Sequence, residues 1–189
     1  MKLFKLISIS KIFFNQTYQK YWFARFLSSL CLGTISVCVA WQIYDISRNP
    51  FHLGLVGLTQ FLPLILLVVV SGYVSDNYNR KIIFSLCMLV ESFLAFLFVA
   101  INFIENIEIN LLFILLIGIG IVRAFFGPAA AALLPNIVTK KDLPDAVALS
   151  AVAWQSGTIF GPIFGGLLYG FSVFAGYLFA AVGLLLASI

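Results

Sequence analysis

Charge is scarce in this chain. Asp, Glu, Lys and Arg make up only 10% of its 189 residues, whereas about 25% is usual in soluble domains. Apolar residues make up 62%, and the mean hydropathy is +1.11. So few charged residues could not cover the surface of a water-soluble fold, so we expect the chain to lie in a lipid bilayer. Its length suits five or six helices of roughly 20 residues each.

Histidine and cysteine are also scarce, which limits the chemistry open to the chain. The one histidine, His52, lies in an expected loop, and the sequence has no cluster of metal ligands. Cys31 and Cys38 are about 10 Å apart along a helix, too far for a disulfide. Cys87 lies in another apolar run, and all three thiols are expected to be buried and inert. We therefore expect no metal, no cofactor and no enzyme, since an intramembrane protease or phosphotransferase needs clustered His, Ser or Asp.

Lysine and arginine outnumber the acidic residues by eleven to seven, which gives a net charge of +4. In a soluble protein this excess could indicate nucleic-acid binding. Here most basic residues lie in the N-terminal tail and in the loops between apolar runs, where they set the orientation of a membrane protein. We therefore expect the lipid bilayer, and no nucleic acid, among the partners.

The apolar residues fall into six runs, which we expect to be helices because an open strand edge cannot be satisfied in lipid. The runs are Tyr21–Tyr44, His52–Val74, Ile82–Ile104, Ile109–Leu134, Ala146–Tyr169 and a last one that begins near Phe171. The expected fold is all-α, with a bundle of six transmembrane helices in residues 21–189. Residues 171–189 are barely long enough for a crossing. The chain is therefore expected to stop in or at the membrane, which would leave its last helix incomplete.

The distribution of basic residues predicts the orientation. The tail and the second and fourth loops hold Lys2, Lys5, Lys11, Lys20, Arg80, Lys81, Lys140 and Lys141. The other loops hold only Arg48, beside Asp45, Glu105 and Glu108. Because basic loops stay inside, we expect a cytoplasmic N-terminus. Residues 1–20 are expected to lie on the cytoplasmic leaflet as an amphipathic segment, since Lys11 interrupts any signal-peptide core.

The second loop, Gly72–Lys81, is the one charged island between two long apolar runs. Gly72 would let the preceding helix pack closely against a neighbour, and Asp76 can accept from backbone N–H groups or pair with an arginine. Arg80 and Lys81 would hold the turn at the membrane surface. These residues are candidates for a functional loop, but the same composition also suits an ordinary loop whose charges only set the orientation.

Glycines recur on one face of the fifth run. Gly157, Gly161 and Gly165 are four residues apart, and Pro162 and Gly166 lie among them. Such a face lets another backbone approach closely, and Pro162 removes a helical hydrogen bond and should bend the helix. Two interpretations stay open, an interface that slides and a static packing seam.

Polar side chains inside the apolar runs are candidates for binding a proton or a substrate, because charge in lipid is costly. Glu91 lies near the middle of the third run and could carry a proton. Arg123, in the fourth run, could line a cavity or act with a gate; alternatively the two are a structural pair or bind backbone carbonyls. Arg25 could instead extend to the inner surface. The uncharged candidates are Gln42, Gln60 and Gln155.

Three of these patterns together resemble the major facilitator superfamily of transporters. Gly72-x-x-x-Asp76-x-x-x-Arg80-Lys81 is similar to its loop motif between helices two and three. Arg123-x-x-x-Gly127 resembles its helix-four motif, and Gly157-x-x-x-Gly161-Pro162-x-x-Gly165-Gly166 resembles its helix-five motif, typical of drug and proton antiporters. Trp41–Asp45 and Leu53–Leu58 further resemble the exporter branch that contains the enterobactin and macrolide efflux proteins.

The resemblance implies the N-terminal six-helix half of a twelve-helix exporter, a multi-pass protein of the bacterial inner (plasma) membrane. It implies proton-coupled, alternating-access efflux of a small amphipathic molecule such as a drug or siderophore. It implies that Asp76 and Arg80 act as a gate, bridging to the other half and latching the outward-open state. The Gly–Pro helix would lie between the halves and let them rock. The implied partners are therefore the small-molecule substrate and a missing C-terminal half or a second copy.

Two features argue against a simple transfer of that mechanism. The loop has Asn77 and Asn79 where the family often has a basic residue and glycine, although Asn tolerates left-handed conformations. One half alone would also leave the glycine face to lipid and Asp76 without its partner. The chain alone is therefore expected not to transport, and the alternative is a truncated, non-transporting remnant or a membrane interaction protein.

Overall fold

The computed structural model describes residues 12, 14–105 and 107–188. Its helices of more than one turn are α2 (Gln16–Ser47), α3 (Pro50–Asn77), α4 (Arg80–Ile101), α5 (Ile109–Ile137), α6 (Leu143–Phe171) and α7 (Val173–Ala187). The described residues form no strand. Five helices are long and apolar enough to cross a membrane, and α7 is apolar but shorter. The expected all-helical membrane fold is confirmed.

Hydrogen bonds at the helix ends explain why the helices do not coincide with the apolar runs. α2 begins at Gln16 rather than Tyr21, because the Asn15 side chain accepts from two backbone N–H groups of the first turn. Asn49 and Asn79 cap α3 and α4 in the same way. The expected amphipathic segment 1–20 lies mostly outside the described residues and stays a prediction.

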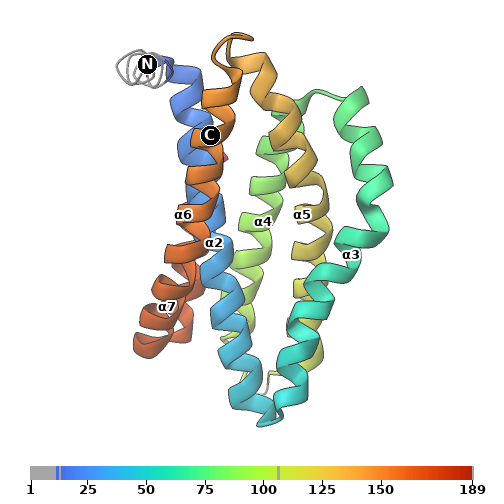
Figure 1. The fold of residues 1–189 in the computed structure, drawn as a ribbon. Coiled ribbons are helices and arrows are strands. Elements are labelled where there is room, and N and C mark those ends of the chain that lie inside the picture. The colour runs from blue at the N-terminus through green and yellow to red at the C-terminus, as the bar shows by residue number, and fades with distance from the viewer. Residues whose placement is uncertain (1–11, 13, 106, 189) are drawn as a thin grey trace.

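The six helices run alternately up and down the bundle. The start of α2, the α3–α4 connection and the α5–α6 connection lie at one end, and the other three connections lie at the opposite end (Figure 1). The end that holds the α3–α4 and α5–α6 connections is called the basic end below, because it carries Arg80, Lys81, Lys140 and Lys141. The common location of the basic loops is what the predicted orientation requires, and their placement in the cytoplasm stays a prediction.

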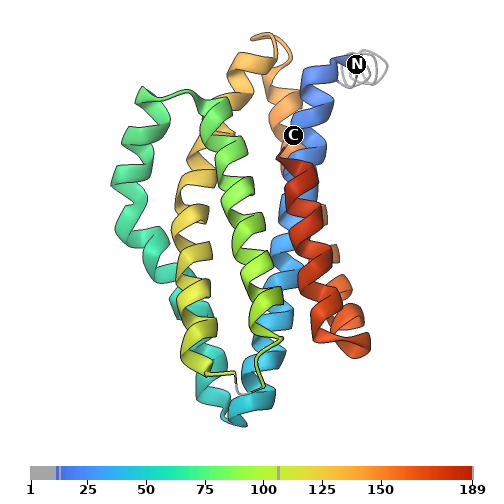
Figure 2. The ribbon, with the colours of Figure 1, turned by 180° about the vertical axis from the view of Figure 1, so that it is seen from behind.

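The first three helices and the last three pack on each other in a symmetric way. α2 packs mainly on α6 and α7, and α5 packs in the corresponding way on α3 and α4. α4 and α7 also contact each other and lie toward the viewer in Figure 2. This is the relation expected of two inverted three-helix repeats. The repeat is therefore visible in the helix contacts, although no internal repeat can be recognised in the amino-acid sequence.

α3 and α6 contribute little to the buried core. Val56 is the one α3 side chain in the main hydrophobic cluster, whose other members come from α2, α4, α5 and α7. The buried residues of α6 are all Ala, Ser or Gly. α3 bends about halfway along its length (Figure 1), and Pro63 lies within it. Both helices therefore present large apolar side chains outward.

Candidate functional site

A cluster of three polar side chains joins α2, α3 and α5. The Arg123 guanidinium donates to Gln60 Oε1 at 3.2 Å, and Ser36 Oγ lies 3.4 Å from the same oxygen. All three residues are partly buried. We call Ser36, Gln60 and Arg123 the central polar cluster. Gln60 and Arg123 were predicted as candidates, whereas Ser36 was missed because a lone hydroxyl in an apolar run gives no signal.

A cavity of about 220 Å³ lies beside this cluster, between α2, α5 and α6. Ser36 and Arg123 line it, together with Trp154 and Thr158 from α6. The Arg25 guanidinium carbon lies 5.4 Å from the centre of the Trp154 ring, a cation–π distance. The cavity therefore combines a cation, hydroxyl groups and an aromatic face, which suits a small amphipathic ligand.

Glu91 is fully buried and makes no hydrogen bond to the central polar cluster. Its exposure is 0%, and neither carboxyl oxygen has a hydrogen-bond partner among the described residues. Arg48 and Asp45 form an ion pair at 3.6 Å, whereas no ion pair joins Glu91 to Arg123. The pair of Glu91 with Arg123, one of the two structural alternatives, is therefore absent.

The two remaining glutamine candidates differ in their surroundings. Gln42 is buried, donates to Asn102 Oδ1 at 2.9 Å and accepts from the Tyr177 hydroxyl at 2.6 Å. Both ends of its amide are therefore occupied in joining α2, α7 and the end of α4. Gln155 is exposed on α6. Of the two, only Gln155 has an amide open to a ligand or another helix.

The glycines that recur on one face of α6, Gly157, Gly161 and Gly165, pack on α2. A Cβ on Gly161 would lie 2.7 Å from the carbonyl oxygen of Leu30, and one on Gly165 would lie 2.9 Å from that of Thr34. A Cβ on Gly157 would likewise lie too close to Ser29 and Leu30 of α2, whereas a Cβ on Gly166 would have no atom within 4 Å. The expectation that this face would be left to lipid is wrong, because α2 of the same chain already covers it.

Side-chain hydrogen bonds also join α2 and α6 along this contact, which is called the α2–α6 seam below. Ser29 Oγ donates to the carbonyl of Trp154 at 2.7 Å, and Thr34 Oγ1 donates to that of Gly161 at 3.1 Å. Trp22 Nε1 donates to Leu149 O nearer the basic end. Close backbone approach and donors to carbonyl groups are the usual means of joining helices in lipid. The contacts suit the static seam that was one of the two interpretations.

The Gly72–Lys81 loop has few contacts within the chain. No described atom lies within 4 Å of a Cβ on Gly72, so the close packing expected there is not made within the described chain. Asp76 is exposed and has no side-chain partner among the described residues, and Arg80 Nε is buried without one. Asn79 has φ −65°, so the loop does not need the left-handed conformation considered for it. Gly127, of the helix-four motif, is likewise open.

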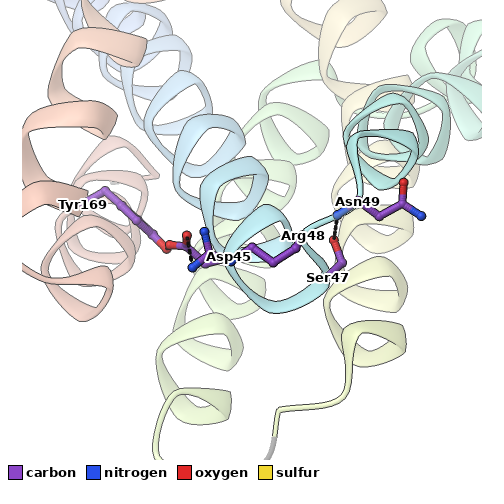
Figure 3. A network of polar contacts seen from close by, with 5 residues as sticks. All are labelled: Asp45, Ser47, Arg48, Asn49 and Tyr169. Atoms are coloured by element: carbon purple, nitrogen blue, oxygen red, sulfur yellow. Dashed lines mark hydrogen bonds and ion pairs between the residues drawn. The ribbon is translucent and has the colours of Figure 1, made fainter.

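The opposite end holds a second polar network, which the sequence analysis missed. The Tyr169 hydroxyl donates to Asp45 at 2.6 Å, and Asp45 pairs with Arg48 (Figure 3). Ser47 Oγ accepts from the Asn49 N–H at the turn into α3. The bond from Tyr169 joins residues 124 positions apart, which no local pattern could indicate. It ties the far ends of α2 and α6 together.

Comparison with known proteins supports the family that these motifs resemble. Residues 9–187 match the family described as transmembrane secretion effector. Enterobactin exporter EntS of Shigella boydii is 28% identical over 169 residues, which cover 86% of this chain and 39% of the relative. EntS proteins of Salmonella typhi and Escherichia coli are 27% identical with the same coverage.

The matched region thus spans less than half of the length of these relatives. The apolar helices and the exporter relatives indicate a multi-pass protein of the inner membrane. The match covers nearly all of the chain, and the resemblance inferred from the three motifs is confirmed. The chain belongs to the transmembrane secretion effector family of the major facilitator superfamily.

Proposed function

We propose that the chain is the N-terminal half of an exporter that moves a small amphipathic molecule outward by alternating access. The observation that carries the proposal is the central polar cluster beside a cavity of about 220 Å³. Drugs and siderophores are the substrate classes that the resemblance implies. Enterobactin is the first compound to test, because the relatives are named as its exporters.

The side chains around the cavity have complementary tasks in this proposal. Arg123 offers guanidinium N–H groups to an acceptor on the substrate, and Gln60 holds the guanidinium in place. Trp154, under Arg25, offers an aromatic face. Such a combination orients an amphipathic molecule without enclosing it. The exposed α3 and α6 leave this half open to a second six-helix unit on the other side of the substrate.

The Gly72–Lys81 loop is the proposed gate. Asp76 is exposed, and Gly72 has free space beside it, so both are accessible to a helix that is not part of the described chain. Arg80 and Lys81 begin α4 next to them. A bridge from Asp76 and Arg80 to the other half would hold one state of the transporter closed at this end. The α2–α6 seam would then move as one body, because its glycines are already packed.

Glu91 is the proposed proton carrier. A carboxylate without a hydrogen-bond partner is costly to bury, so we infer that Glu91 binds a proton when its surroundings are closed. Opening of the bundle to water would let the proton leave. Binding and release on opposite sides would couple export to the proton gradient.

Loss of Arg123 tests the proposed substrate site. The test uses a polypeptide that joins this chain to a second six-helix half, called the longer polypeptide below. In it, Arg123→Gln should lower enterobactin efflux from cells on the order of tenfold or more, because a charge-assisted hydrogen bond is lost. Arg48→Gln is the matched control, since it removes the same charge from an exposed position outside the bundle. Efflux is measured as external enterobactin per amount of membrane-inserted protein.

Equal efflux by Arg123→Gln and the unsubstituted protein would contradict the proposed site. No efflux by the unsubstituted longer protein, with any of several siderophores and drugs, would favour the alternative of a non-transporting remnant.

Substitution of Glu91 separates proton coupling from stability. Glu91→Gln should abolish the dependence of efflux on a pH gradient, and Glu91→Leu should do so without lowering the melting temperature, because the carboxyl has no bond to lose. Efflux is followed in vesicles with and without an imposed gradient, and Glu105→Gln, in an exposed loop, is the control. Gradient-dependent efflux by Glu91→Gln would exclude Glu91 as the carrier.

A further inference from the structure

A second, larger cavity lies at the basic end and is separate from the proposed substrate site. It has a volume of about 480 Å³ and is bounded by α2, α4, α5 and the last residues of α7. It shares no lining residue with the cavity beside Arg123. A cavity of this size between helix ends calls for an occupant whose chemistry matches its walls.

Cations and hydrogen-bond donors line the mouth of this cavity. Lys20 from α2 and Lys81 from α4 both line it and are both exposed. Neither lysine has an acidic partner in the described part of the chain. Asn136 and Thr17 add uncharged polar groups. Two unpaired lysines on different helices favour an anionic group between them.

The floor of the cavity is apolar. Phe84 and Met88, one turn apart on α4, are 4% and 1% exposed and present their side chains to it. Tyr21 also lines the floor, but its hydroxyl already contacts Ala130 O and Ser150 Oγ, each at 3.1 Å. It therefore offers its ring rather than a polar group. An inorganic anion would use only the mouth, whereas an amphiphile would use mouth and floor.

We propose that this cavity binds an anionic phospholipid, with its phosphate between Lys20 and Lys81 and the start of an acyl chain on Phe84 and Met88. The charge of the mouth and the apolar floor together match this ligand and neither a neutral lipid nor free phosphate. The proposal does not depend on transport. It assigns to Lys20 and Lys81 a ligand in addition to any influence on orientation.

Native mass spectrometry of the purified chain tests the site with phosphatidylglycerol and phosphatidylcholine as probes. We expect tight binding of one phosphatidylglycerol, which Lys20→Gln with Lys81→Gln should weaken on the order of 30-fold. Lys140→Gln with Lys141→Gln is the matched control: both lysines are exposed at the same end and do not line the cavity. Ser85→Phe keeps every lysine but should prevent binding by filling the cavity.

Each other outcome would overturn the proposal. Equal weakening by both lysine pairs would indicate diffuse attraction to a basic surface. Equal binding of phosphatidylcholine, or displacement by inorganic phosphate at similar concentration, would exclude an anionic lipid. Retained binding by Ser85→Phe would place the lipid outside the cavity. Ala187, the last residue of α7, and Ser188, which follows it, line the cavity. Binding to this chain but not to a longer polypeptide would therefore mean that further chain fills the cavity.

Discussion

Gly161→Leu is expected to separate α2 from α6 and prevent the bundle from forming. Even the first added atom, Cβ, would lie 2.7 Å from Leu30 O and 2.8 Å from the Cα of Gly33. Both neighbours are backbone atoms, so no side-chain rotation can make room. We therefore expect the cost to exceed the roughly 1–3 kcal/mol of an ordinary overpacked core. Gly161→Ala, which adds only Cβ, should fall between Gly161→Leu and the unsubstituted chain.

Gly166→Leu provides the matched control on the same helix. A Cβ on Gly166 meets nothing within 4 Å, so the same substitution five residues away should leave the fold intact. Both variants are compared by fluorescence-detected size exclusion and by thermal unfolding in one detergent. Similar melting temperatures for Gly161→Leu and Gly166→Leu would mean that the α2–α6 seam is not as tight as the structure describes.

The number and order of the helices could be predicted because apolar runs and basic loops are local features. The exact limits could not, because side-chain caps decide them. Asn15 starts α2 five residues before the apolar run begins, and Asn79 starts α4 by accepting from Lys81 N. A polar residue beside an apolar run can end a span or extend the helix beyond it, and hydropathy does not distinguish the two.

The candidate site was predicted as a set of residue types, not as an arrangement. Arg123 and Gln60 were both singled out, but their contact joins positions 63 apart and depends on how α5 packs on α3. The stripe of Gly157, Gly161 and Gly165 correctly indicated close helix packing, while its expected exposure to lipid was wrong. A small-residue face predicts that a neighbour approaches closely, but the fold decides which neighbour it is.

The chain Met1–Ile189 alone, reconstituted in lipid vesicles, is expected to move no enterobactin above the background leak. Alternating access requires two bodies on either side of a substrate site. The described helices form one body, in which α4 and α7 close one side while α3 and α6 remain uncovered. The cavity beside Arg123 is lined by α2, α5 and α6, which all belong to this one body. The longer polypeptide should transport under the same conditions, because it would provide the second body.

Asp76→Asn in the longer polypeptide tests whether the proposed gate joins this chain to the second six-helix half. Its exposed carboxyl has no partner among the described residues, so the substitution should leave the stability of the isolated chain unchanged. Efflux by the longer protein should nevertheless fall by about tenfold, the effect of losing a charge-assisted bond. Asp142→Asn, in the α5–α6 connection at the same end, is the control. Efflux by the 189-residue chain as a proven monomer would contradict the two-body mechanism, whereas efflux by a dimer would mean that a second copy serves as the other half.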